Sequence, residues 1–324
     1  SRRFSPRGLL LALIVVGGGL SAVFTNDIVA LALTPVLVQS CLKRGLSPLP
    51  FLLALACAVN VGSAATLVGN PQNILIGQSL GMSFAGYFAL ALVPSLLGLG
   101  VVWALTLALW KEEMRPGSAA APAPSTEVNR PFDRWQTGKG LVLASVVLVL
   151  FLFTSLPREA VGMGAAGVIL LSRRFHTREM LGLVDWELLV LFLGLFVGNG
   201  ALLEAGLLER GLAWLQGVGI EVARPAALFL VSPLLSLAVS NVPATMLLLP
   251  VAEGPYAGAV LALSSTLAGN ALIIGSVANF IVLEQAARSG IVVTWRQHAA
   301  LGVPVTLGTL ALAAGALWMG ALVG

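Results

Sequence analysis

Long apolar runs fill this chain, and short polar stretches interrupt them at a few positions. Two of these interruptions share one pattern, Ala65-Thr66-Leu67-Val68-Gly69-Asn70 and Ser265-Thr266-Leu267-Ala268-Gly269-Asn270. Asn and Ser compete for backbone hydrogen bonds, Gly costs about 1 kcal/mol against Ala in a helix, and Pro71 lacks a backbone donor. Each stretch therefore predicts a broken helix, and a membrane tolerates such a break only where protein or a water-filled cavity satisfies the freed groups.

Two further interruptions predict helical hairpins. Residues 8–39 form two apolar arms around Thr25-Asn26-Asp27, and residues 225–252 form two arms around Ser240-Asn241-Val242-Pro243. Each arm is shorter than the ~20 residues that a full span needs, so we expect re-entrant hairpins with buried tips. For residues 8–39, one long tilted helix is the alternative.

The remaining segments complete an all-α polytopic membrane protein with two repeats, joined by a linker at 111–139 that is rich in Pro, Ala and charged residues. The first repeat, 1–110, is expected to hold the hairpin 8–39, the broken helix 49–79 and a span at 83–110. The second repeat, 140–324, is expected to hold scaffold spans at 140–203, an interfacial helix at 204–219, the hairpin 225–252, the broken helix 256–287 and a last span at 298–322. Because spans precede only the second hairpin, we expect the first repeat to lack its matching N-terminal scaffold helices.

Composition and charge support this layout. The chain is 58% hydrophobic and 10% charged, with a mean hydropathy of +0.96, whereas soluble domains are about 25% charged. All of the 18 Lys and Arg except Arg158, Arg210 and Arg224 fall on one predicted side, which the positive-inside rule identifies as cytoplasmic. The same layout makes the two hairpins enter from opposite sides, so the repeats are inverted.

The repeats also align residue by residue. Ser21-Ala22-Val23-Phe24-Thr25-Asn26 matches Ser236-Leu237-Ala238-Val239-Ser240-Asn241, and the stretch from Thr66 to Asn70 matches that from Thr266 to Asn270. Two such matches in the same order are typical of transporter repeats, in which broken helices build the binding site near the bilayer midplane.

The tips and breaks supply the candidate substrate- or ion-binding residues. These are Thr25, Asn26, Asp27, Asn60, Ser63, Thr66, Gly69, Asn70, Asn73, Ser240, Asn241, Thr266, Gly269, Asn270, Ser276 and Asn279. No Lys or Arg lies among them, so a dianion would depend on helix N-termini and on Asn or Ser donors. A neutral weak acid with several hydroxyls suits such a site better, since Asn both donates and accepts. Asn70 and Asn270 are also candidates for holding Na⁺. The sequence predicts no other metal site, and no cofactor beyond H⁺ or Na⁺ as a coupling ion.

Asp27 is the only carboxylate at a tip. An ionisable residue inside a membrane is a functional hypothesis by default, so we expect Asp27 to carry a proton in alternation with cargo. The alternative is a capping role, in which Asp27 accepts backbone N–H groups at the start of the following helix. His298 borders an interfacial stretch and is not predicted to be a ligand.

In the strings Gly69-Asn70-Pro71-Gln72-Asn73 and Ser265-Thr266-Leu267-Ala268-Gly269-Asn270 the chain resembles the ion-transporter superfamily. It is most similar there to arsenite efflux pump membrane subunits, plant silicon efflux transporters and bacterial anion transporters with a citrate-transporter-like domain. The resemblance implies a scaffold that supports a homodimer and a transport domain that moves as an elevator. Dicarboxylate carriers of the superfamily have Ser-Asn-Thr at both tips, so the departures at Asp27 and Val242 argue against that substrate class.

Together these observations predict a secondary active transporter, multi-pass in the inner (plasma) membrane, and not an enzyme. We expect proton-coupled export of an inorganic oxyanion or its neutral acid, of the arsenite or silicate kind. The alternatives are a Na⁺/H⁺ antiporter and an anion or dicarboxylate symporter. The sequence shows no ATP-binding motif, so any ATP dependence would need a separate ATPase subunit, and nothing in it indicates a nucleic-acid partner.

Overall fold

The computed structural model describes residues 5–113, 134–154, 156–171, 204–217, 221–254 and 256–323, with scattered positions between 186 and 219. Every regular element in these residues is an α- or 3₁₀-helix, so the all-α class is confirmed. The predicted linker and the predicted spans beyond residue 171 lie largely outside the described residues. Contacts divide the chain into two compact units, one of residues 1–125 with 212–324 and one of residues 126–211.

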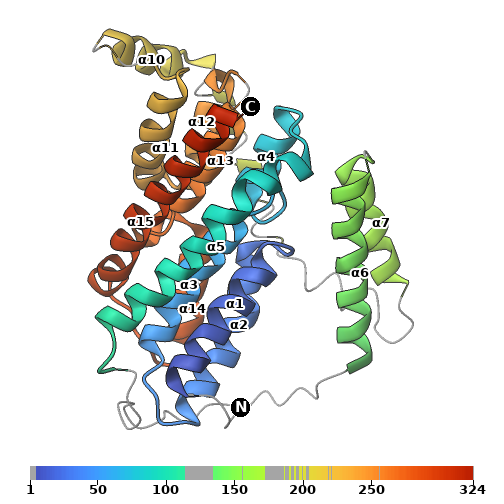
Figure 1. Ribbon diagram of the computed structural model, residues 1–324, viewed down its shortest axis with the longest axis vertical. Helices are drawn as coiled ribbons and strands as arrows, with labels where there is room; N and C mark the ends of the chain where they lie inside the picture. Colours follow the sequence, from blue (N-terminus) through green and yellow to red (C-terminus); the bar gives the residue numbers. More distant parts are fainter. Residues whose placement is uncertain are drawn as a thin grey trace. The chain divides into compact units, whose positions relative to one another are not determined.

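The larger unit holds the helices on either side of every predicted tip and break (Figure 1). In chain order they are α1 (Pro6–Ser21), α2 (Asn26–Leu42), α3 (Leu49–Ser63), α4 (Pro71–Ser79), α5 (Phe84–Leu109), α11 (Pro225–Val239), α12 (Asn241–Leu248), η1 (Leu249–Val251), α13 (Ala257–Ala268), η2 (Ile273–Gly275), α14 (Val277–Arg288) and α15 (Trp295–Val323). Elements of both predicted repeats therefore share one unit, while the repeat boundaries themselves stay a prediction.

The helices stop at the predicted tips. α1 ends at Ser21 and α2 begins at Asn26, so the alternative of a single continuous helix through 8–39 is wrong. Between α11 and α12 only Ser240 is non-helical, with φ 76° and ψ 160°. That backbone region is essentially reserved for glycine, so holding Ser240 there costs on the order of 1–3 kcal/mol.

The two broken helices are interrupted where Gly and Asn occur. α3 ends at Ser63 and α4 begins at Pro71, and Asn70 caps α4 by accepting the Asn73 N–H on its Oδ1 (2.8 Å). In the second broken helix α13 ends at Ala268, and the chain passes through η2 before α14 begins.

The helices of the larger unit pack in matching pairs. α1 contacts α3, and α11 contacts α13, so each predicted hairpin lies on the first arm of its own broken helix. α2 contacts α14, and α12 contacts α4, so each predicted hairpin also touches the second arm of the other broken helix. α5 and α15 lie side by side (Figure 1), and a Cβ at Gly98 of α5 would come within 3.1 Å of Thr309 Cγ2 on α15. Glycine at this position therefore permits the close approach.

Two helices of the described residues are long and apolar enough to cross a membrane, and they are α5 and α15. Both coincide with segments that the hydropathy predicts as spans. Eight further apolar helices have 10–17 residues, fewer than the ~20 that a straight span needs.

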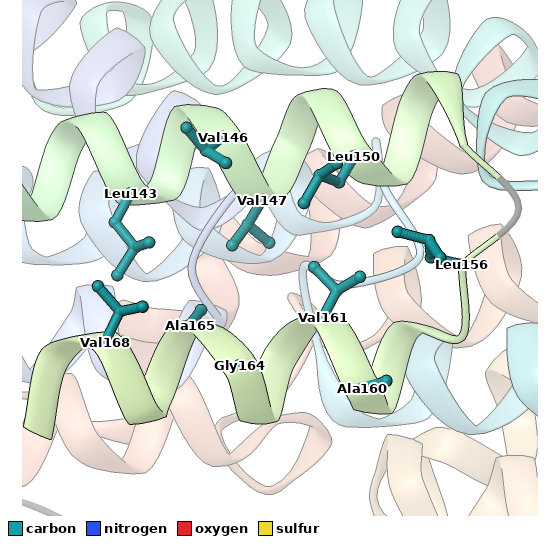
Figure 2. A pocket seen from close by; sticks show the side chains of 10 residues that line it. All are labelled: Leu143, Val146, Val147, Leu150, Leu156, Ala160, Val161, Gly164, Ala165 and Val168. Carbon is teal, nitrogen blue, oxygen red and sulfur yellow. The ribbon is translucent and has the colours of Figure 1, made fainter.

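The smaller unit contains α6 (Arg134–Phe153) and α7 (Arg158–Leu170), which contact each other, and α10 (Leu207–Gly217) crosses the division between the units. Figure 2 shows an apolar groove between α6 and α7, lined by aliphatic side chains such as Leu143, Val147 and Val161. The residues that line it have no polar side chain, so this groove is a separate feature from the predicted polar site.

Candidate functional site: two reciprocal polar centres

The first polar centre is the side chain of Asn60, which is fully buried in α3. Its Oδ1 accepts hydrogen bonds from Asn26 Nδ2 (2.9 Å) at the first tip and from Ser276 Oγ (2.9 Å) at the start of α14. Its Nδ2 donates to Asn270 Oδ1 (3.2 Å) and to Asn279 Oδ1 (3.1 Å). Both acceptor positions and both N–H groups of this amide are therefore occupied by protein partners, and none is left for a ligand.

The second polar centre is the fully buried hydroxyl of Thr266 in α13, which holds the first break. Thr266 Oγ1 accepts hydrogen bonds from Asn70 Nδ2 and from Gln72 Nε2, both at 3.2 Å. It donates to Asn73 Oδ1, also at 3.2 Å. The two centres are thus reciprocal, because Asn60 in residues 1–110 binds the second broken helix and Thr266 in residues 140–324 binds the first.

Local bonds complete the first break. Asn70 Nδ2 donates to Ser63 Oγ (3.1 Å), and Asn73 Nδ2 donates to the backbone oxygen of Thr66 (3.0 Å). A Cβ at Gly69 would collide with the backbone of Ser63, so only glycine lets the chain return so closely to the end of α3. The Gly-Asn pair is therefore a geometric requirement of this break.

The second break satisfies its carbonyl groups with side-chain amides. Asn279 Nδ2 donates to the backbone oxygens of Gly269 (2.8 Å) and Leu272 (3.0 Å). Asn270 Nδ2 donates to the backbone oxygen of Leu267 (3.2 Å). Leu267 and Gly269 lie at the end of α13, where intrahelical donors run out, and Leu272 follows within the break. The asparagine amides therefore supply the donors that a continuous helix would have supplied.

The first tip is tied directly to the first break. The Asn26 backbone N–H donates to Gly69 O (2.9 Å), and Thr66 Oγ1 donates to Ala22 O (2.6 Å). Asp27 follows in the first turn of α2, and only 4% of its surface is exposed. Its backbone N–H donates to Asn26 Oδ1 (3.1 Å), so the carboxylate sits one residue from the bond that joins the tip to Asn60.

The second tip makes no such connection. Ser240 Oγ lies 3.5 Å from Asn241 Oδ1, and among the hydrogen bonds of the described residues none joins either side chain to Asn60 or Thr266. Thr25 at the first tip likewise gives α2 no side-chain capping bond. The structure therefore gathers the predicted residues of both breaks with Asn26 into one network and leaves the second tip outside it.

The amides of this network keep a mixed set of hydrogen-bonding positions. Among the described residues, Asn70, Asn73 and Asn279 donate with both N–H groups, and each Oδ1 accepts one hydrogen bond where it could accept two. Within the same part of the chain, one N–H of Asn26 and one N–H of Asn270 have no hydrogen-bond partner. A molecule in contact with these atoms would therefore have to both donate and accept hydrogen bonds.

Three residues outside the candidate set also belong to the network, and they are Gln72, Tyr87 and His298. Tyr87 Oη donates to Ala64 O (2.7 Å), and His298 Nε2 lies 3.0 Å from Asn270 O. Gln72 stands inside the Gly-Asn-Pro-Gln-Asn string, so the motif itself could have marked it. No local sequence signal marks Tyr87 or His298, because their partners lie 23 and 28 residues away in the chain.

Comparison with known proteins gives matches along most of the chain. The model of the citrate transporter family matches residues 2–261. The 46 kDa membrane protein of Mycobacterium leprae is 30% identical over 98% of this chain and 79% of its own length. Inner membrane protein YbiR of Escherichia coli is 34% identical over 92% of this chain and 74% of its own length. The silicon efflux transporter LSI3 of Oryza sativa is 28% identical over 93% of this chain and 76% of its own length.

Proposed function

Because the chain belongs to the citrate transporter family, we propose that it is a secondary active transporter that exports a neutral inorganic hydroxy acid in exchange for a proton. Membership of this family supports the assignment as a transporter. The observation that supports a neutral hydroxy acid as cargo is the network around Asn60 and Thr266. In the part of the chain that the structure describes, its amides have both N–H groups and Oδ1 acceptor positions without a partner.

Charge favours a neutral cargo over a polyanion. Neither tip and neither break contains Lys or Arg, and the one charged residue among the tip and break positions is the acidic Asp27. A citrate trianion would meet this carboxylate without a fixed countercharge, and burying an uncompensated charge costs several kcal/mol. Arsenous acid and silicic acid are neutral near pH 7 and carry several O–H groups, so they match amides that both donate and accept.

The reciprocal packing supports two inverted repeats with re-entrant hairpins. Each predicted hairpin touches the first arm of its own broken helix and the second arm of the other. An exchange of partners of this kind is what a two-fold relation between halves produces. We infer that the larger unit is the mobile transport domain of an elevator and that residues 126–211 belong to the scaffold.

Asp27 is the proposed proton carrier. Its position in the first turn of α2, buried and adjacent to Asn26, lets a change in its charge act on the Asn26–Asn60 bond. Protonation would take up a carboxylate oxygen that can otherwise accept a hydrogen bond from an O–H group of the cargo, so proton and cargo would use Asp27 in alternation.

The relatives' names support the setting. One is called an inner membrane protein and another a silicon efflux transporter. We propose a multi-pass protein of the plasma membrane that forms a homodimer through its scaffold. If transport depended on ATP, we propose that a separate ATPase subunit would bind this protein.

A Na⁺/H⁺ antiporter is the second candidate, and oxygen atoms at the breaks favour it. The Oδ1 atoms of Asn70, Asn73 and Asn279 each have one acceptor position without a partner among the described residues. Such oxygen atoms suit Na⁺, and Asp27 could supply the countercharge. The antiporter would bind Na⁺ at the site where the exporter would bind a hydroxy acid.

The full chain in proteoliposomes separates the two. We expect uptake of arsenous or silicic acid to be driven by an imposed pH gradient, and no uptake of citrate. Protein-free vesicles and Ser264→Ala are the controls, since among the described residues the buried Ser264 hydroxyl bonds only to carbonyls of its own helix. Proton movement driven by Na⁺ without any hydroxy acid would replace the proposal by the antiporter, and pH-driven uptake of citrate would overturn the cargo class.

A further inference from the structure

One face of α15 follows the second break. His298 Nε2 lies 3.0 Å from the backbone oxygen of Asn270, and Thr306 Oγ1 donates to the backbone oxygen of Leu267 at 3.4 Å. Between them, a Cβ at Gly302 would collide with the same Asn270 oxygen. The three positions are four residues apart, so they form one stripe that lies on the carbonyl groups freed by the break.

The first break has a counterpart to this contact. Tyr87 Oη donates to the backbone oxygen of Ala64 (2.7 Å), just after the end of α3. Tyr87 is the fourth residue of α5, and His298 is the fourth residue of α15. The helix following each broken helix therefore sends its fourth side chain to a carbonyl group at the break.

The starts of α5 and α15 strengthen this correspondence. Ser83 Oγ accepts the Gly86 N–H (3.2 Å), and Thr294 Oγ1 accepts the Gln297 N–H (3.3 Å). In both cases a Ser or Thr directly before the helix caps the N–H three positions later. The next residue, Tyr87 or His298, is the one whose side chain reaches the break. The equivalence of Tyr87 and His298 thus rests on two contacts in each half, the cap at the helix start and the contact with the break.

The two side chains differ in their chemistry. A phenol stays protonated near neutral pH, whereas an imidazole gains a proton between about pH 5 and 8. The Asn270 oxygen can only accept, so the neutral ring carries its hydrogen on Nε2 and leaves Nδ1 with a lone pair. His298 is 1% exposed, and Nδ1 has no hydrogen-bond partner among the described residues.

The described elements around His298 offer no countercharge. α15 packs against α3, α5, α13 and η2, and none of these elements contains Asp, Glu, Lys or Arg. Their only titratable side chains are Cys57 and Tyr87. Arg296 on α15 itself lies over the Trp295 ring, and Glu284 and Arg288 of α14 pair with each other at the surface.

We propose that His298 is a positioning residue for the second break, and that its neutral ring holds Asn270 in the orientation that binds Asn60. Protonation would add a buried charge and an Nδ1–H without an acceptor, which favours a state in which the ring leaves the break for water. The second break then responds to pH, whereas the first, held by Tyr87, does not.

Hydrogen–deuterium exchange of the purified full chain tests this without any cargo, so its outcome is independent of the proposed transport activity. The segment to follow is 266–279, compared between variant and wild type at pH 5.5 and at pH 7.5. His298→Leu removes the donor, and His298→Gln keeps an N–H at a similar reach but cannot titrate. Tyr87→Phe is the matched control in the other half.

We expect His298→Leu to exchange about tenfold faster than wild type in 266–279 at pH 7.5, as the loss of one buried hydrogen bond implies. His298→Gln should match wild type at pH 7.5 and lack the additional opening that wild type shows at pH 5.5. Tyr87→Phe should open 62–73 equally at both pH values. Unchanged exchange in His298→Leu, or the wild-type pH response in His298→Gln, would overturn the proposal.

Discussion

Replacing Asn60 by Ala removes the amide on which four hydrogen bonds between distant parts of the chain converge. The four bonds have lengths of 2.9–3.2 Å, and three of them reach residues at or beyond position 270. At about 1 kcal/mol for each bond, the free energy of unfolding should fall by about 4 kcal/mol. Native proteins have only about 5–15 kcal/mol in total, so this single change should weaken the core severely.

The groups left behind explain why the loss is not smaller. Asn26, Asn270, Asn279 and Ser276 are each at most 2% exposed, so water cannot simply replace the missing amide. A buried polar group without a partner costs about 1–3 kcal/mol, although water entering the new cavity recovers part of that. The estimate of about 4 kcal/mol therefore lies toward the lower end of the possible range.

Unfolding of the purified protein in mixed micelles, titrated with SDS, measures this loss. Ser264→Ala is the control, because its equally buried hydroxyl bonds only within its own helix, and it should cost about 1 kcal/mol or less. Thr266→Val, which deletes three bonds without making a cavity, should cost about 3 kcal/mol. If Asn60→Ala costs no more than Ser264→Ala, Asn60 does not hold the two broken helices together.

Three further outcomes are expected. Asn70→Ala and Asn270→Ala should each abolish uptake of arsenous or silicic acid in proteoliposomes while circular dichroism stays helical, and normal uptake by both folded variants would show that the breaks are not the site. Asp27→Asn should lose pH-driven accumulation and keep passive exchange of cargo, and undiminished pH-driven accumulation would leave Asp27 with a capping role only. Gly302→Ala should destabilise the protein by about 1–3 kcal/mol through overpacking against Asn270 O, whereas Gly315→Ala, with open space around it on the same helix, should not; equal melting temperatures would contradict the close approach.

The sequence predicts the breaks well because their cause is local. Gly69 and Asn70 are needed at the spot where they occur, one for its missing side chain and the other for its capping oxygen. The start of α1 is local too: Ser5 caps it and Pro6 opens it, two residues before the predicted start of the first arm. Such signals lie within a few positions of the structure that they produce.

The partners of the polar side chains could not be predicted in this way. Asn60 binds Asn279 across 219 positions, and Thr266 binds Gln72 across 194. The repeat indicates that the two breaks are related, but it does not say that each is completed by the other. The sequence does not predict the contact of His298 with the second break for the same reason, since one histidine near a helix start has no pattern of its own.

The span of these bonds has a consequence for how the protein is made. Asn60 enters the membrane long before Asn279 has been synthesised, and at about 5–20 residues per second the delay is roughly 10–40 s. During that interval the amide of α3 lacks three of its four partners inside a hydrophobic medium. The hydrogen bonds of Asn60 to the second broken helix can therefore form only after residues 270–279 have been synthesised. Biogenesis, and not the finished fold alone, therefore depends on the carboxyl-terminal broken helix.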